Sequence, residues 1–153
     1  MEITTFGAGC FWGVQSSFDR IEGVNKTIVG FMGGNIINPT YEQVCSGKTG
    51  HVEVVQIEFD SKIVSYRELL KVFWKIHDPT QINRQGFDIG SQYKSIIFYH
   101  NVEQKIDAEE SKKHLEDSNF YKKKIATEIK SCLKFYPAEE YHQKYFKKIG
   151  YNK

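Results

Sequence analysis

Apolar residues recur at helical spacing over residues 11–21. They stand at Phe11, Val14, Phe18 and Ile21, three or four positions apart. This spacing places them on one side of a helix, whereas Trp12 lies off that stripe. Gly23 suits the end of such a helix, because glycine readily adopts the left-handed backbone found there. We therefore predict a helix over 11–21 that is buried along one side.

The segment that begins at Ser65 has the same periodicity and a defined start. Ser65 and Glu68 form the Ser-x-x-Glu pattern of a capping box, and Asp78-Pro79 ends the helix because the residue before proline disfavours helical backbone. Weaker patterns predict three further helices, over 41–45, 102–117 and 138–148.

Short apolar segments between the helices read as strands. We predict them over 3–6, 25–31, 51–59, 96–99 and 125–129. A polar, glycine-containing loop over 80–92 is longer than most connections, which favours a functional role. Strands and helices that alternate without a strict βαβ rhythm indicate an α+β fold. We expect a two-layer sandwich, in which helices pack on a mixed β-sheet with a ferredoxin-like core.

The composition narrows the class of protein. The 153 residues suit a single domain over 1–153, and the net charge of +2 is too small to indicate a nucleic-acid partner. No segment resembles a secretory leader or a bilayer-spanning helix, so we expect a cytoplasmic monomer without a membrane partner. Three widely spaced cysteines fit a reducing compartment, and no metal site is expected because no Cys-x-x-Cys or His-x-x-x-His pair occurs.

Cys10 stands where the first strand meets the first helix, between glycines in Gly7-Ala8-Gly9-Cys10-Phe11-Trp12-Gly13. Free N–H groups at a helix start favour negative charge, so we expect a thiol pKa below about 8.5 and a reactive cysteine. The alternative is a small buried side chain that fills a gap. Cys45 and Cys132 lack this setting, and we expect both to be buried small hydrophobes.

Glu53 lies on the apolar side of its strand, in phase with Val55, Ile57 and Phe59. If that side is covered, burial raises the carboxyl pKa, and Glu53 can carry a proton as a general acid near neutral pH. The alternative is a solvated strand end. A histidine base next to Cys10 would instead suit an acyl hydrolase, for which His51 is the candidate. A non-catalytic binding module is a third possibility.

Four segments together resemble the type A peptide-methionine (S)-S-oxide reductases. They are GCFWG at 9–13, NPTYEQVCSGKTGHVEVV at 38–55, FWKIHDPTQINRQGFDIGSQYKS at 73–95, and ATEI with FYPAEEYHQ at 126–129 and 135–143. These enzymes reduce the S epimer of methionine sulfoxide, free or in proteins. The resemblance implies that Cys10 is the nucleophile and that Phe11 and Trp12 hold the S-methyl group of the substrate. Helical phase makes Trp12 the freer of these two side chains.

The resemblance also implies roles at the sulfoxide oxygen. Glu53 would protonate or hydrogen-bond this oxygen, Tyr41 and Tyr93 would assist, and Asp88 would help to order the site. Attack by a thiolate would leave methionine and a sulfenic acid on Cys10.

The sequence leaves undecided which thiol reduces that sulfenic acid back to a thiol. Many relatives carry resolving cysteines in a C-terminal tail, whereas this chain has none after Cys132. Either Cys132 or Cys45 resolves, or an external thiol such as thioredoxin, glutaredoxin or glutathione attacks Cys10 directly. Phe31 is a second departure, because relatives commonly have tyrosine there. The expected partners are oxidised proteins, free methionine sulfoxide and a thiol reductant, with no bound cofactor.

Overall fold

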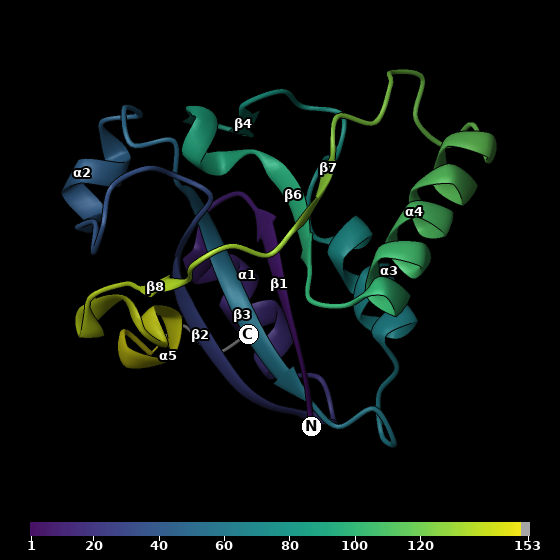
Figure 1. Cartoon of the computed structure of the whole chain (residues 1–153), viewed down its shortest axis with the longest axis horizontal. Helices are drawn as coiled ribbons and strands as arrows, with labels where there is room; N and C mark the ends of the chain where they lie inside the picture. Colours follow the sequence, from purple (N-terminus) through teal and green to yellow (C-terminus); the bar gives the residue numbers. More distant parts are fainter. Residues whose placement is uncertain (151–153) are drawn as a thin grey trace.

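A six-stranded sheet forms the centre of the protein (Figure 1). The structure, a computed structural model, describes residues 1–150, so the predicted domain over 1–153 includes three residues outside the described part. The strands are β1 (Glu2–Ala8), β2 (Val24–Met32), β3 (Val52–Phe59), β6 (Ser95–Tyr99), β7 (Glu128–Ser131) and β8 (Tyr136–Pro137). Their order is β7-β6-β1-β3-β2-β8. The central order β6-β1-β3-β2 is that of a ferredoxin-like core. The pair β6 and β7 is parallel while the other pairs are antiparallel, which confirms the predicted mixed sheet.

The helices follow the predicted periodicity closely. They are α1 (Phe11–Asp19), α2 (Tyr41–Cys45), α3 (Tyr66–Lys75), α4 (Val102–Asp117) and α5 (Tyr145–Lys148), with 3-10 turns η1 (Ser91–Tyr93) and η2 (Glu140–His142). The Ser65 hydroxyl accepts a hydrogen bond from the Glu68 backbone N–H at 3.1 Å, which completes the predicted capping box. Among the described residues, no helix is long and apolar enough to cross a bilayer.

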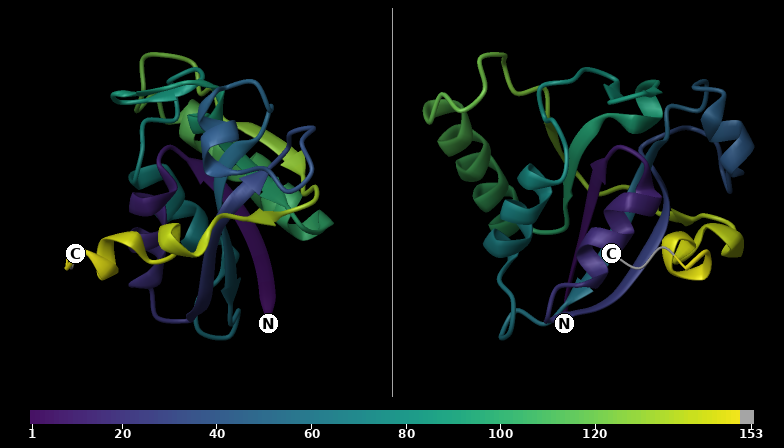
Figure 2. Two further views of the ribbon diagram at one scale, coloured as in Figure 1. Left: turned by 90° about the vertical axis from the view of Figure 1, so that its left-hand side faces the viewer. Right: turned by 180° about the vertical axis from the view of Figure 1, so that it is seen from behind.

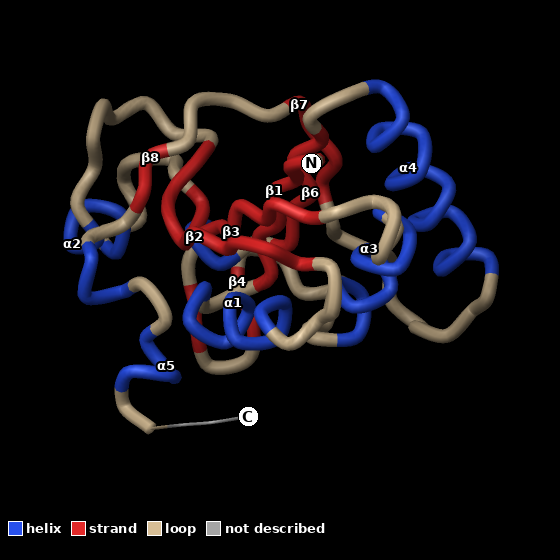
Figure 3. Tube along the Cα trace, turned by 90° about the horizontal axis from the view of Figure 1, so that it is seen from below, coloured by secondary structure: helices blue, strands red, loops and turns tan. Residues whose placement is uncertain are grey.

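Helices α1 and α3 cover one face of the sheet, and α4 packs beside α3 (Figure 3). The stripe predicted on α1 is buried at Phe11, Val14 and Phe18. The ring of Phe6 from β1 stacks on Phe18 at 5.4 Å between centroids and lies 5.0 Å from Phe73 of α3. These aromatic contacts hold α1 and α3 against the sheet near the end of β1 that leads to Cys10.

The opposite face is covered by the chain itself. After β7 the segment 132–135 crosses the sheet to reach β8 at the other edge, as the yellow-green strip in Figure 1 shows. Cys132 and Phe135 from this segment pack on a second buried cluster, which consists of Met32, Val52, Val54, Ile96 and Phe98. Strand β3 is therefore buried on both faces over 52–55.

Two predictions near the C-terminus are wrong. The strand predicted over 125–129 is Glu128–Ser131 and is followed by one more strand, β8, and a continuous helix over 138–148 does not form. The Gln143 side chain bonds both the N–H and the C=O of Val29 (3.0 and 2.9 Å), so this part of the chain follows the edge of β2. Lys144 then adopts a left-handed φ of 56°, which separates η2 from α5.

The predicted loop over 80–92 contains structure of its own. Strands β4 (Arg84–Gln85) and β5 (Asp88–Ile89) form a small hairpin that projects from the body of the protein (Figure 2). The turn is Gly86-Phe87, and Gly86 has a φ of 60°. A two-residue hairpin turn requires such positive φ, which glycine adopts without steric cost.

Candidate active site

Cys10 lies at the junction between β1 and α1. Gly9 has a φ of 98°, which redirects the chain, and Cys10 then occupies the N-cap position of the helix that starts at Phe11, without a capping hydrogen bond from its side chain. A Cβ atom on Gly9 would lie 2.9 Å from the side chain of Gln85 on the β4–β5 hairpin. Glycine is therefore needed here both for the turn and for the close approach of the hairpin to the cysteine.

Glu53 is buried beside this junction. Glu53 is 1% exposed, and its Oε1 accepts a hydrogen bond from the Phe11 N–H at 3.1 Å. Its Oε2 is also buried and has no hydrogen-bond partner within residues 1–150. Burial, with a smaller contribution from the charge of Asp88, raises the Glu53 pKa from 4.5 to about 8. The solvated strand end considered above is therefore wrong, and the carboxyl carries its proton at neutral pH.

The thiol of Cys10 behaves differently from the sequence-based expectation. The N–H groups of Trp12 and Gly13 favour the thiolate, as predicted for a helix start. Burial and the nearby Glu53 charge outweigh them and raise the Cys10 pKa to about 11. The expectation of a pKa below 8.5 is thus wrong for the free enzyme. Both the thiol and the carboxyl are protonated at neutral pH before a substrate binds.

An aromatic wall stands next to Cys10. Phe11 is buried and Trp12 half-buried, in the order that helical phase predicts, and the Tyr41 ring stacks on both, at centroid distances of 6.0 and 6.3 Å. The indole N–H of Trp12 donates to Nδ1 of His142 at 3.0 Å, and Tyr145 stacks on the Trp12 ring at 3.9 Å. The wall is thus assembled from α1, α2 and the C-terminal segment.

Polar groups face this wall from two short elements. The hydroxyls of Tyr41 and Tyr93 both lie close enough to the Cys45 thiol to influence its pKa. Burial raises the pKa of both tyrosines, so both remain protonated donors. Gln92 ties the two elements together, since its Nε2 donates to the Cys45 carbonyl at 3.4 Å. The expectation that Cys45 is a buried hydrophobe is wrong, because the residue is exposed and in contact with the site.

Comparison with known proteins gives a consistent result. A family model described as "Peptide methionine sulfoxide reductase" matches residues 2–152. The chain belongs to the peptide methionine sulfoxide reductase family. MsrA of Methanothermobacter thermautotrophicus is 56% identical over 96% of this chain and 87% of its own. MsrA of Saccharolobus solfataricus is 51% identical over 99% of this chain and 85% of its own.

Solved reductases share the fold. Reduced Mxr1 from Saccharomyces cerevisiae superposes with a TM-score of 0.90 at 34% identity, over 96% of this chain and 84% of that one. Methionine sulfoxide reductase A of Corynebacterium diphtheriae gives a TM-score of 0.86 at 36% identity, over 96% and 74%.

The reductase fold gathers the candidate residues around Cys10. Tyr41, Glu53, Asp88 and Tyr93 all lie close enough to be linked by hydrogen bonds or charge interactions around Cys10 and Cys45. Sequence reasoning missed His142 and Tyr145, which hold Trp12. The FYPAEEYHQ segment was an available signal for His142, because its match to the family pointed to a role at the site.

Cys132 is not part of this group. It packs on the opposite face of the sheet, and its N–H donates to the Tyr99 carbonyl at the far end of β6. Ala8, beside the Cys10 turn, pairs with Ser95 at the near end. Four residues of strand separate these ends by ~13 Å, whereas a disulfide needs Cα atoms within about 7 Å. A direct disulfide between Cys10 and Cys132 does not fit this arrangement.

His51 holds backbone rather than a nucleophile. Its Nδ1 accepts from the Gly34 N–H at 3.0 Å, and its Nε2 donates to the Ile36 carbonyl at 2.8 Å. Both ring nitrogens are occupied in this way, so His51 cannot serve as the base that an acyl hydrolase would require. Among residues 1–150, no group of three metal-ligating side chains comes together.

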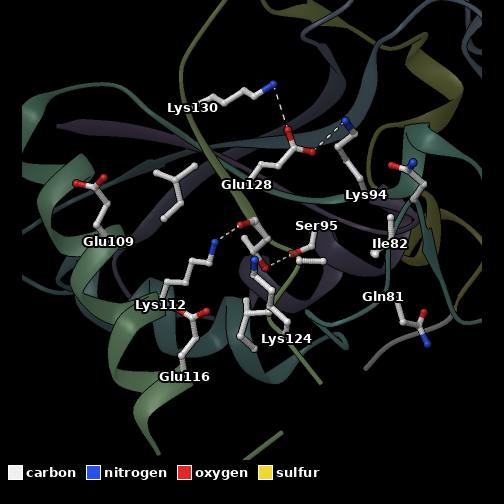
Figure 4. Close-up of a pocket in the computed structure, with 15 residues that line it drawn as sticks. Gln81, Ile82, Lys94, Ser95, Glu109, Lys112, Glu116, Lys124, Glu128 and Lys130 are labelled. Carbon is white, nitrogen blue, oxygen red and sulfur yellow. Dashed lines mark hydrogen bonds and ion pairs between the residues drawn. The ribbon is translucent and has the colours of Figure 1, made fainter. Parts of the chain in front are cut away.

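A separate cavity of about 760 Å³ lies between α4 and β7 and is not lined by Cys10, Glu53 or the aromatic wall (Figure 4). Its lysines are mostly paired within the protein. Glu128 bridges Lys94 and Lys130 at 3.0 and 3.1 Å, and Lys112 donates to the Thr127 carbonyl at 2.9 Å. Because three of its four lysines already have partners within the protein, we give this cavity no part in the chemistry.

Proposed function

We propose that this chain reduces the S epimer of methionine sulfoxide to methionine, both free and within proteins, in one catalytic domain over residues 1–153. The observation that carries the proposal is the buried, protonated carboxyl of Glu53 beside the Cys10 thiol. An acid and a sulfur nucleophile in one dry site are what sulfoxide reduction requires, and membership of the family agrees with this.

The acid activates the substrate. A sulfoxide sulfur is a poor electrophile until its oxygen receives a proton or strong hydrogen bonds. In our proposal the unpartnered Oε2 of Glu53 serves that oxygen, and the hydroxyls of Tyr41 and Tyr93 add further donors. Donors that are already in place stabilise the charge that develops in the transition state.

Cys10 then attacks the sulfoxide sulfur. The attack forms an S–S bond as the protonated oxygen leaves the substrate sulfur as water. This S–S bond breaks when water adds to the Cys10 sulfur, which releases methionine and leaves a sulfenic acid on Cys10. The substrate sulfur is reduced by two electrons and the cysteine is oxidised by two. Over both steps, the thiol proton accounts for the sulfenic hydroxyl, and no net proton is consumed. A neutral Glu53 no longer repels the thiolate, while the N–H groups of Trp12 and Gly13 stabilise it.

The aromatic wall supplies the binding energy in this proposal. The S-methyl group would rest against Phe11 and Trp12, where the ring of Trp12 is fixed by His142 and Tyr145. A fixed wall on one side and oxygen donors on the other distinguish the two epimers, because exchange of methyl and oxygen breaks both contacts.

An external thiol resets Cys10 in our proposal. Thioredoxin, glutaredoxin or glutathione would attack the sulfenic sulfur, release water and form a mixed disulfide, which a second thiol then reduces. Mxr1 has also been solved in complex with Trx2. Cys132 is too distant to resolve Cys10. We further propose that the enzyme works as a monomer in the cytoplasm, where such reductants keep thiols reduced.

The test is turnover of N-acetyl methionine (S)-sulfoxide with dithiothreitol. We expect turnover by the wild type, none by Cys10→Ser, and almost none with the R epimer. Cys132→Ser is the matched control and should retain full activity. One equivalent of sulfoxide without reductant should consume one of the three thiols. Loss of two thiols would reveal an internal disulfide, and turnover by Cys10→Ser would contradict the proposal.

A further inference from the structure

The β4–β5 hairpin exposes large apolar side chains that the proposed chemistry does not use. Phe87 at its turn is 102% exposed and Ile89 is 68% exposed. We call these two residues the hairpin patch. Apolar side chains grouped on a short segment commonly mark an interaction site.

The hairpin patch lies at the entrance to the site. Gln85 packs against the Gly9 turn, so close that a Cβ atom on Gly9 would meet it at 2.9 Å. Asp88, between Phe87 and Ile89, lies near enough to act on the charges of Cys10 and Glu53. When a methionine sulfoxide of a polypeptide substrate lies at Cys10, residues only a few positions away in that substrate can therefore contact the hairpin patch. An extended chain covers about 3.3 Å per residue.

Hydrogen bonds hold the hairpin in one geometry. The Gln85 amide accepts from the Asp78 N–H and donates to the Asp78 carbonyl, both at 2.8 Å. The Gln81 side chain accepts from the Gly86 N–H at 2.7 Å. The Gly90 N–H donates to Asn83, which closes the base of the hairpin. Because the hairpin is already ordered, a partner that binds Phe87 does not have to fix a flexible loop.

We propose that the hairpin patch binds apolar residues that flank methionine sulfoxide in unfolded polypeptide segments. This rests on the proposed function. Methionine is usually buried, so apolar residues recur near it in the sequence, two positions away in a strand and three or four positions away in a helix. Its oxidation disrupts the core and exposes them. The same apolar contact adds no binding energy for free methionine sulfoxide, because this small substrate has no flanking residues that could contact the hairpin patch. The patch therefore sets a preference among protein substrates and leaves the chemical step unchanged.

Two peptides of equal length test the proposal, one with leucine and valine around methionine (S)-sulfoxide and one with serine and glycine, both with dithiothreitol. We expect Phe87→Ser to lower kcat/KM about tenfold for the apolar peptide, which corresponds to about 1.4 kcal/mol. Ile89→Ser should act in the same direction. The polar peptide and N-acetyl methionine (S)-sulfoxide should be reduced at wild-type rates. Ile63→Ser is the matched control, because Ile63 is 55% exposed beside Gly23 at the other end of the sheet.

A binding measurement separates this proposal from the catalytic one. Fluorescence anisotropy with labelled sulfoxide peptides and the inactive Cys10→Ser protein should show a preference for the apolar peptide, lost in Cys10→Ser/Phe87→Ser. Equal binding of both peptides would overturn the docking role even if the enzyme turns over. An effect of Phe87→Ser on the KM for thioredoxin, with both peptides unaffected, would overturn it in favour of a reductant-binding surface.

Discussion

Replacement of Glu53 by glutamine should stabilise the fold while it disables the enzyme. The amide oxygen of the new side chain can still accept the hydrogen bond from the Phe11 N–H, so the local geometry is preserved. The variant has no carboxyl to titrate, so it avoids the free-energy cost of keeping a 1% exposed carboxyl protonated above its ordinary pKa of 4.5 and of ionising it in the fold above about pH 8. Destabilising buried charges of this kind persist where function needs them.

The size of the effect follows from the Glu53 pKa, which is 4.5 in ordinary surroundings and about 8 in the fold. A pKa raised on folding adds relative stability below pH 4.5, and this is lost as the pH rises through 8. At 1.36 kcal/mol per pH unit, the wild type should lose about 3.5 kcal/mol relative to Glu53→Gln between pH 5 and pH 8. Denaturant unfolding of both proteins at these pH values measures the difference.

A stability difference that does not change with pH would refute this reasoning. The unpartnered amide group of the Glu53→Gln variant adds a constant offset, so the slope is the informative quantity. Turnover of N-acetyl methionine (S)-sulfoxide by Glu53→Gln should fall by about 10²-fold or more, the usual contribution of a general acid. The loss should be greatest at about pH 7 to 8, where hydronium is too dilute to replace the missing proton while wild-type Glu53 still carries its own, and it should shrink at higher pH as Glu53 ionises.

Other measurements test neighbouring titratable groups. Alkylation of Cys10 should follow a pKa of about 11 and shift to lower pH in Glu53→Gln, because the repelling charge is removed; an unchanged profile would show that the two groups do not interact. His77 is buried against Phe73 and Ser95 and has its pKa lowered to about 4, so its stability contribution is complete above about pH 6.5 and falls towards pH 4. Between pH 6.5 and pH 4, the unfolding free energy of the wild type should therefore fall by up to about 3 kcal/mol more than that of His77→Gln.

The sequence predicts the central fold because its patterns are local. Helical spacing locates α1, the capping box locates α3, and the bounds of α4 match the predicted 102–117. The C-terminal part resists such reasoning, since its path depends on a long-range contact. Gln143 binds the edge of β2, and nothing in the neighbouring residues indicates that partner.

The candidate site shows the same division. The alternation of its strand predicts which side of β3 carries Glu53, but its burial does not follow from alternation, because β3 is buried on both faces over 52–55. The thiol pKa of Cys10 does not follow from the sequence, because a local effect of the helix start is reversed by burial and by a carboxyl on a distant strand. The exposed thiol of Cys45 depends likewise on the packing of α2 against η1.

The bond between Trp12 and His142 has a consequence for synthesis of the protein. It joins residues 130 positions apart, and Lys144 similarly bonds Gln15 across 129 positions. The wall beside Cys10 therefore cannot be completed until residues 142–145 have left the ribosome. Until then a nascent chain carries Cys10 without the fixed Trp12 ring against which, in our proposal, the substrate methyl group rests.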